Sequence, residues 1–164
     1  MIHILGEKSN SRLTAVQDGD SQPNAIDLRL GKVFAINNTL FELSEEGKTH
    51  RGTTEITPDY DWYYLKEGTY EVVMENLVTV GADEAGWVIT RSTLNRNGVF
   101  ITSGLYDSGY NGVMAGAMHV RGGPVRIKKG TRVAQFLLFK AEALTLYNGS
   151  YGLNSEHDKK YTKE

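Results

Sequence analysis

Three polar clusters interrupt apolar, strand-like sequence with charged and hydroxyl side chains. They span residues 22–31, 86–99 and 104–112, and their charged residues include Asp27, Arg91 and Asp107. Burying a charge is costly unless it is paired or faces a polar site. The guanidinium group of an arginine such as Arg91 can also grip phosphate oxygens in a bidentate way. We therefore expect one site that is assembled from separated pieces of chain.

Several common catalytic chemistries lack the residues that they need. The chain has no cysteine, which excludes disulfides, Cys-ligated zinc and thiol nucleophiles. It also contains no GxxxxGK[ST], HExxH or GxSxG pattern. The histidines lack ligand spacing, so we expect surface or structural roles rather than metal ligation for His3, His50, His119 and His157. The ligands of a zinc deaminase are therefore missing.

The sequence around the polar clusters predicts mainly strands, which must position their side chains. Glycine occurs 18 times and proline only 3 times, and the chain carries 9 tyrosines, 5 phenylalanines and 2 tryptophans. Many turns with aromatic residues between them favour β-structure. The strands that we predict cover residues 31–36, 68–74, 87–90, 99–102, 112–119, 125–127 and 132–139. The best helical candidates are the first fifteen residues and a short turn at 92–97. The sequence thus predicts an all-β fold, a compact barrel or jelly roll.

The length of 164 residues suits one domain, which we place at residues 1–154. Residues 43–59 are polar and turn-rich and predict an exposed insertion or long loop. Residues 155–164 mix both charge signs without apolar anchors, so we expect a mobile C-terminal tail unless a ligand orders it.

Charge and hydropathy restrict the partners. The formal net charge of -2 gives no bulk electrostatic argument for binding nucleic acid. No apolar run is long enough to cross a membrane, and the N-terminus lacks the pattern of a signal peptide. We expect a cytoplasmic location, which would be the cytoplasm of an infected host cell if the protein is viral.

Taken together, the clusters resemble motifs of the dCTP deaminase/dUTPase superfamily over about residues 22–151. The first is similar to "PxSxDLRLG", the second to "RSSLARLG" and the third to "GxIDxxYxG", while residues 130–136 are similar to "PGxRIAQ". Each motif alone is weak, but four in this order at about the right separations are specific. The resemblance implies a distorted jelly-roll β-barrel of the trimeric dUTPase type with few short helices. It also implies a homotrimer with nucleotide sites between subunits, a deoxynucleoside triphosphate substrate and Mg²⁺.

The superfamily includes two reactions, and the residue at position 117 helps to decide which of them the resemblance implies. Its deaminases convert dCTP to dUTP with a glutamate five residues after the glycine of the third motif, whereas its dUTPases hydrolyse dUTP to dUMP and pyrophosphate. Counting from Gly112 gives Ala117, and residues 113–119 contain no carboxylate. Without a general acid–base group, water cannot be activated for attack on cytosine C4. We therefore expect a dUTPase or a related pyrophosphatase on a deaminase-like scaffold.

Two details of the sequence combine features of the deaminase branch and the dUTPase branch of the superfamily. The first two motifs resemble the deaminase branch more than ordinary trimeric dUTPases, and the glycine-rich final motif "GxGGFGSTG" of dUTPases is missing. Residues 147–152 resemble the deaminase-branch "YxGxYxG" only in part.

The resemblance implies catalytic roles for Asp107 and Gln135. Asp107 aligns with an aspartate that holds the sugar 3′-hydroxyl and helps to orient water, although an Asp-Ser-Gly turn is the alternative. Gln135 aligns with a glutamine that contacts the phosphates or the water. Asp27 aligns with an aspartate near the metal, and a structural bond is its alternative role. For Arg132, a structural ion pair and substrate binding are equally expected.

The resemblance also implies substrate-binding residues. Arg91 and Ser92 align with positions that bind the phosphates, and Arg96 and Ala117 align with positions near the base. Tyr110 aligns with a position on the deoxyribose. Tyr147 and Tyr151 lie in the tail and would close over the triphosphate. Tyr110 would pack on the sugar and clash with a 2′-hydroxyl, and the strand of Ala117 would read the base through main-chain groups. Structural alternatives are a helix cap for Ser92, a surface role for Arg96 and core packing for the tyrosines.

Four functions remain open at this point. The first is hydrolysis of dUTP, and the second is an enzyme for dCTP or a modified pyrimidine triphosphate, including deamination of dCTP. The third is a non-catalytic nucleotide-binding or regulatory protein, and the fourth is a structural jelly-roll subunit. The fourth leaves the polar clusters as coincidence.

Overall fold

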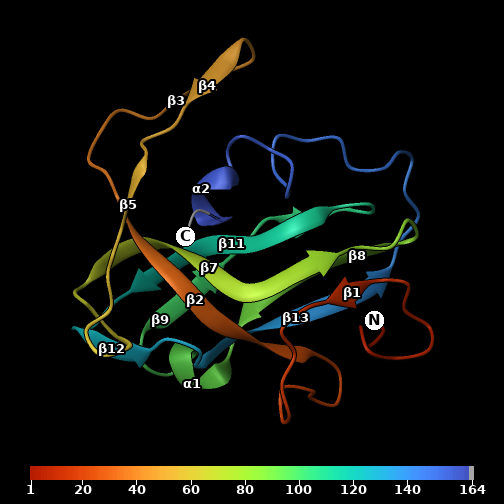
Figure 1. Cartoon of the computed structure of the whole chain (residues 1–164), viewed down its shortest axis with the longest axis horizontal. Helices are drawn as coiled ribbons and strands as arrows, with labels where there is room; N and C mark the ends of the chain where they lie inside the picture. The colour runs from red at the N-terminus through yellow and green to blue at the C-terminus, as the bar shows by residue number, and fades with distance from the viewer. Residues whose placement is uncertain (163–164) are drawn as a thin grey trace.

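The computed structural model describes residues 1–162, which form strands and two single-turn helices (Figure 1). The strands are β1 (Arg12–Leu13), β2 (Ile26–Ile36), β3 (Glu42–Ser44), β4 (Gly47–Thr49), β5 (Thr53–Glu55), β6 (Trp62–Leu65), β7 (Gly68–Thr79), β8 (Glu84–Thr90), β9 (Val99–Thr102), β10 (Leu105–Tyr106), β11 (Asn111–Val120), β12 (Val125–Lys128) and β13 (Arg132–Lys140). The helices are α1 (Ser92–Asn95) and α2 (Lys159–Thr162). The prediction of an all-β fold with few short helices is confirmed. No helix within residues 1–162 has the length and apolar character needed to cross a membrane.

One antiparallel sheet of nine strands organises the molecule. Its order is β10-β8-β13-β2-β7-β11-β9, with β1 paired to β7 and β5 paired to β2. The long strands β2 and β7 curve strongly, so the sheet curls over on itself (Figure 1). The β2–β7 register shifts between Leu30 and Lys32, where a Cβ atom on Gly31 would lie 2.9 Å from the Val73 carbonyl oxygen. Glycine therefore permits the close strand contact at this bend.

The core lies inside the curl and follows from alternation along the strands. Leu28 and Leu30 of β2, Val72 of β7 and Met118 of β11 are fully buried, and Phe136 of β13 is almost so. Successive side chains of a strand point to opposite faces, so Leu28 and Leu30 face the same core. The opposite face is covered in part as well, because Val73 lies in a second buried cluster with Phe34, Val113 and Tyr161.

Most predicted elements are confirmed, and one prediction is wrong. The seven predicted strands correspond to β2, β7, β8, β9, β11, β12 and β13, and the turn at 92–97 contains α1. The first fifteen residues are not a helix, because they contain only turns, a bridge from Ile2 to Leu138, and β1.

The buried carboxylate of Glu84 explains why the N-terminal segment is not helical. It accepts hydrogen bonds from the backbone N–H groups of Asn10 and Ser11, both at 2.9 Å, and from the Ser11 hydroxyl. Lys140 Nζ lies 2.9 Å from the same carboxylate. A helix would use these N–H groups internally, whereas here they satisfy a charge on β8.

The two regions expected outside the core differ from each other. Residues 43–59 are largely exposed and include the β3–β4 hairpin, which projects from the body of the molecule (Figure 1). In the tail, Asp158 and Tyr161 are buried, and the Tyr161 ring packs edge-on against Phe34 with centroids 5.7 Å apart. The prediction that the tail lacks an apolar anchor is therefore wrong, since Tyr161 is one. Its mobility stays a prediction, and residues 163–164 lie outside the described residues.

We predict that Glu84→Gln lowers the free energy of unfolding by about 2 kcal/mol at neutral pH, because hydrogen bonds to a buried charge are lost. Burial raises the pKa of the Glu84 carboxyl, but the hydrogen bonds from Ser11 and Asn10 and the Lys140 ammonium outweigh it and lower the pKa below 4.5. The stabilisation is therefore present above pH 4.5 and lost as pH falls through the folded-state pKa. Urea unfolding at pH 7 and in acid measures both effects, and a variant as stable as wild type at pH 7 would contradict the prediction.

Candidate functional site

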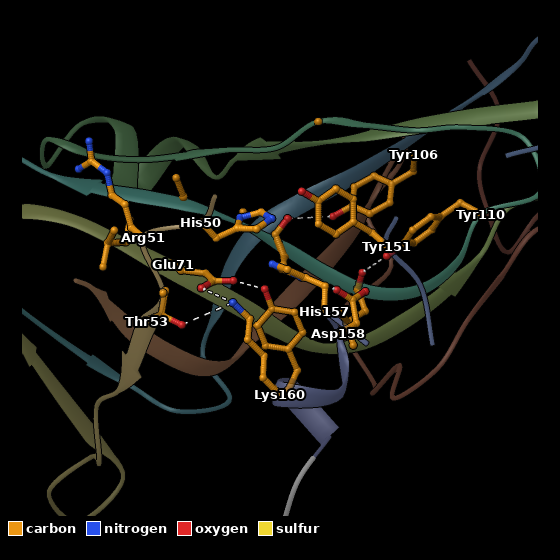
Figure 2. Close-up of a pocket in the computed structure, with 18 of the residues that line it drawn as sticks. His50, Arg51, Thr53, Glu71, Tyr106, Tyr110, Tyr151, His157, Asp158 and Lys160 are labelled. Atoms are coloured by element: carbon orange, nitrogen blue, oxygen red, sulfur yellow. Dashed lines mark hydrogen bonds and ion pairs between the residues drawn. The ribbon is translucent and has the colours of Figure 1, made fainter. Parts of the chain in front are cut away.

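A cavity of about 560 Å³ lies between β7 and β11 on one side and the C-terminal segment on the other (Figure 2). This volume falls within the roughly 300–1,000 Å³ that is usual for small-molecule sites. Its lining includes the tyrosines Tyr106, Tyr110, Tyr147 and Tyr151. Three of the sequence-predicted binding tyrosines therefore meet at one place.

The tyrosines of this cavity form a ladder that continues the core. Ring centroids are 5.8 Å apart for Phe136 and Tyr106, 5.3 Å for Tyr106 and Tyr110, and 5.3 Å for Tyr110 and Tyr147, all edge-to-face. Tyr110 is buried, and its hydroxyl donates to the Val113 carbonyl at 2.7 Å. Burial raises the pKa of both Tyr106 and Tyr110 far above the usual value, so both hydroxyls remain protonated. Because neighbouring rings are nearly perpendicular, the ladder offers apolar ring faces and edges rather than one flat wall, and these can pack against a sugar or a base.

Tyr147 and Tyr151 lie on the segment that covers the cavity. The Tyr147 backbone N–H donates to the Ser108 carbonyl at 2.8 Å, and the Tyr147 hydroxyl accepts the Tyr151 N–H at 3.1 Å. Lys48 Nζ lies 4.9 Å from the centroid of the half-exposed Tyr151 ring. The two tyrosines are therefore held on this side of the cavity, and their role in closing over a ligand stays a prediction.

Ala117 also lines the cavity, and its neighbour on the next strand is a carboxylate that sequence reasoning missed. Ala117 of β11 pairs in register with Glu71 of β7, and both residues face the cavity. Glu71 receives an ion pair from Lys160 at 3.1 Å and a hydrogen bond from the Tyr161 hydroxyl. No motif surrounds Glu71, and only the strand register brings it to Ala117.

Two histidines expected on the surface also reach the cavity. The ring centroids of His50 and His157 are 4.8 Å apart, and His157 Nδ1 lies 3.1 Å from Asp158 Oδ1. Burial and the neighbouring His157 lower the pKa of His50. The other oxygen of Asp158 accepts the Gly152 N–H at 2.7 Å, which fixes the covering segment. Sequence reasoning gave no signal for these contacts, because they depend on how the tail folds back.

A second group of predicted residues gathers around the fully buried Asp27. Its Oδ1 accepts a hydrogen bond from Gln135 Nε2 at 3.0 Å, as expected for residues paired in register on β2 and β13. Its Oδ2 lies 3.4 Å from the guanidinium nitrogens of both Arg91 and Arg132. Arg132 also donates to the Gly19 carbonyl at 2.7 Å, which ties it to a loop. The carboxylate thus holds two arginines side by side.

This donor set does not fit a metal ion at Asp27. The carboxylate faces two cations and an amide N–H, whereas Mg²⁺ prefers several oxygen ligands. Residues 1–162 hold no group of three or more acidic or histidine side chains that could bind a metal.

Helix α1 presents the remaining two predicted binding residues. Ser92 is its exposed first residue and Arg96 is exposed at its C-cap. The N-cap is Arg91, which makes no side-chain capping bond, so the alternative of Ser92 as the cap is wrong. The Ser92 hydroxyl is therefore not used by the helix start.

Asp107 lies in the turn between β10 and β11, beside Tyr106 of the cavity. Its carbonyl accepts the Tyr110 N–H at 3.0 Å, and Gly109 has a φ of 83°, so the Asp-Ser-Gly turn is real. The Asp107 side chain is exposed. The turn therefore directs the carboxylate outward, where a ligand could reach it.

One chain separates the predicted residues into two groups. Tyr110, Ala117, Tyr147 and Tyr151 line the cavity. The lining formed by residues 1–162 does not include Asp27, Arg91, Ser92, Arg96 or Gln135. Asp107 is not a lining residue either, but it directly follows the lining residue Tyr106 and so stays with the cavity rather than with the arginines. The tyrosine-lined cavity is thus distinct from the arginine-rich group around Asp27 within a single chain.

Comparisons with known proteins identify the family of this chain. Residues 2–141 match the family model described as dCTP deaminase-like. A relative from Halobacterium salinarum, named "Probable deoxyuridine 5'-triphosphate nucleotidohydrolase", is 30% identical over 142 residues, which cover 83% of this chain and 85% of the relative. A relative from Acidianus ambivalens, named "dCTP deaminase", is 30% identical over 132 residues, covering 78% of this chain and 75% of the relative.

A solved structure supports the fold. The 2'-deoxycytidine 5'-triphosphate deaminase from Agrobacterium tumefaciens superposes with a TM-score of 0.62 at 19% identity over 82% of this chain, which spans 44% of that protein's length. With a family model that covers most of its length and relatives at 30% identity, the chain belongs to the dCTP deaminase-like family.

Proposed function

We propose that this protein hydrolyses dUTP to dUMP and pyrophosphate. The observation that carries the proposal is the tyrosine-lined cavity in which Tyr110 and Ala117 meet without a carboxylate on β11. The apolar ring surface of the tyrosines suits a deoxyribose, and the small Ala117 leaves room for a base beside the β11 backbone. The name of the Halobacterium salinarum relative supports the same substrate.

Phosphate contacts would come from the second group of residues. Arg91 is oriented by Asp27, and the exposed Ser92 hydroxyl follows it at the start of α1. A guanidinium and a hydroxyl can hold phosphate oxygens while a water attacks the α-phosphorus. Asp107, exposed beside the cavity, would hold the 3′-hydroxyl and orient that water, with Gln135 near the phosphates.

We further infer that each site is completed by a second subunit of a homotrimer. The tyrosine-lined cavity and the arginine-rich group are separate within one chain, yet one triphosphate must touch both. Closed symmetric oligomers satisfy this need by placing one group of each subunit against the other group of its neighbour.

Magnesium would enter with the substrate rather than on Asp27. Mg²⁺ is commonly bound through substrate phosphates with only one or two carboxylates. Its contribution would be to neutralise charge on the triphosphate.

A second candidate function is deamination of dCTP. The name of the Acidianus ambivalens relative favours it, whereas Ala117 at the position of the family glutamate argues against it. Formation of dUTP from dCTP would separate this reaction from hydrolysis.

We predict that the purified protein with Mg²⁺ releases dUMP and pyrophosphate from dUTP in preference to dCTP and dTTP, and that chelation of Mg²⁺ stops the reaction. Asp107→Asn should reduce kcat by about 100-fold or more, because the water loses its orienting carboxylate. Chromatography of the products measures both. The matched control is Asp59→Asn, another exposed aspartate, which should keep full activity. Turnover of none of the three nucleotides would rule the proposal out.

We predict that Asp107→Asn and Arg91→Ala chains, each inactive alone, regain activity when co-expressed. Random mixing in a trimer with shared sites leaves roughly a quarter of the sites with both native groups, so roughly a quarter of wild-type activity should return. Light scattering of the same sample measures the oligomeric state. A mixture that stays inactive while still trimeric would show that each site is built from one chain.

A further inference from the structure

The cavity contains a carboxylate that the family motifs do not assign. Glu71 of β7 lies directly opposite Ala117 of β11, and residues paired in this way in an antiparallel sheet share one face. Both residues line the cavity, and the Glu71 side chain is only 16% exposed. An acceptor therefore stands beside the strand on which the base is expected.

The tail currently supplies the hydrogen-bond donors for this carboxylate. Lys160 Nζ lies 3.1 Å from Glu71 Oε2, and the Tyr161 hydroxyl donates to Oε1 (Figure 2). Lys160 Nζ also lies 3.5 Å from the Thr53 hydroxyl. Burial and the hydrogen bond to Glu71 raise the pKa of Tyr161 far above its usual value, so its hydroxyl stays a donor.

These contacts come from a short element that another donor could replace. Helix α2 has four residues, and Lys160 is one-third exposed in its pairing with Glu71. An ionised carboxylate is acceptor-only, and a partly buried acceptor without a donor is costly. A ligand that takes this place must therefore bring an N–H or O–H group.

We propose that Glu71 reads the base, by accepting a hydrogen bond from the imide N3–H of a uracil-type nucleotide in the place that Lys160 now occupies, while Tyr161 stays buried against Phe34. This inference rests on the proposed function and adds to it a side chain that determines base specificity. Methylation of N3 removes the donor and leaves the carboxylate facing a methyl group. Glu71 is thus expected to discriminate between uracil and N3-methyluracil.

The test measures the binding of two probes by calorimetry: the non-hydrolysable α,β-imido analogue of dUTP, and the same analogue methylated at N3. Wild type should bind the unmethylated probe more tightly. In Glu71→Leu, the unmethylated probe should lose about tenfold in affinity, because a charge-assisted hydrogen bond is gone. The methylated probe should bind Glu71→Leu no more weakly than it binds wild type.

A matched control separates base reading from docking of the tail. Lys160→Met with Tyr161→Phe removes both tail donors and leaves the carboxylate in place. This double variant should keep the wild-type ratio between the two probes, and thermal unfolding checks that both variants fold. If the double variant loses the ratio as Glu71→Leu does, docking of the tail explains the effect and the inference is overturned.

The outcomes also separate this inference from the proposed function. If wild type hydrolyses dUTP but Glu71→Leu keeps the wild-type ratio, the inference alone is wrong and the β11 backbone reads the base. If wild type neither hydrolyses dUTP nor binds the unmethylated probe, the proposed function is overturned and the inference with it.

Discussion

Hydrogen bonding of β7 on both edges sets the geometry on which the rest of the molecule depends. Strand β7 pairs with β2 on one side and with β11 on the other, and Val72 and Val78 are fully buried. Because side chains alternate, a slip of one residue would turn Glu71 away from the cavity and Val72 into it. The register that buries the core is therefore the same register that places Glu71 opposite Ala117. Core and cavity cannot be varied independently along this strand.

Besides Asp158 in the covering segment, the buried carboxylates of Glu84, Asp20 and Asp27 attach loops to this sheet. Glu84 holds the N-terminal segment. Asp20 lies in the loop that precedes β2, and its Oδ1 is 2.6 Å from the Arg29 guanidinium nitrogen Nη2. Asp27 holds Arg91 and Arg132. A buried charge left without its partner is strongly destabilising, so each pair defines one position for its loop. The arginine that we assign to phosphate binding is thus held in place before any ligand arrives.

The strands were predictable because their signal is local. Residues 99–102 and 132–139 are apolar and bounded by turn residues, and both form strands where expected. The polar clusters likewise marked Asp27 and Arg91, which carry charge within apolar sequence, whereas Arg132 and Gln135 were found through the resemblance of residues 130–136 to a family motif. Local sequence therefore identified the fold class and part of the arginine-rich group.

The errors and omissions arise where the deciding partner is distant. The N-terminal segment was interpreted as a helix because nothing near Ser11 indicates that Glu84, 73 residues later, takes its N–H group. Glu71 was missed because its importance depends on pairing with Ala117, and Tyr161 because a single aromatic residue in a charged tail gives no pattern. Such contacts become visible only when the chain has folded.

The pairing of β2 with β13 has a consequence for how the chain folds. Asp27 and Gln135 are direct partners although 108 residues separate them, and Ile2 bridges to Leu138. The edge of β2 that receives β13 must therefore stay unpaired during synthesis until the ribosome has delivered almost the whole chain. Topologies dominated by such distant pairings fold slowly and expose strand edges while they do so. Production of this protein is thus expected to benefit from chaperones that shield an open β2 edge.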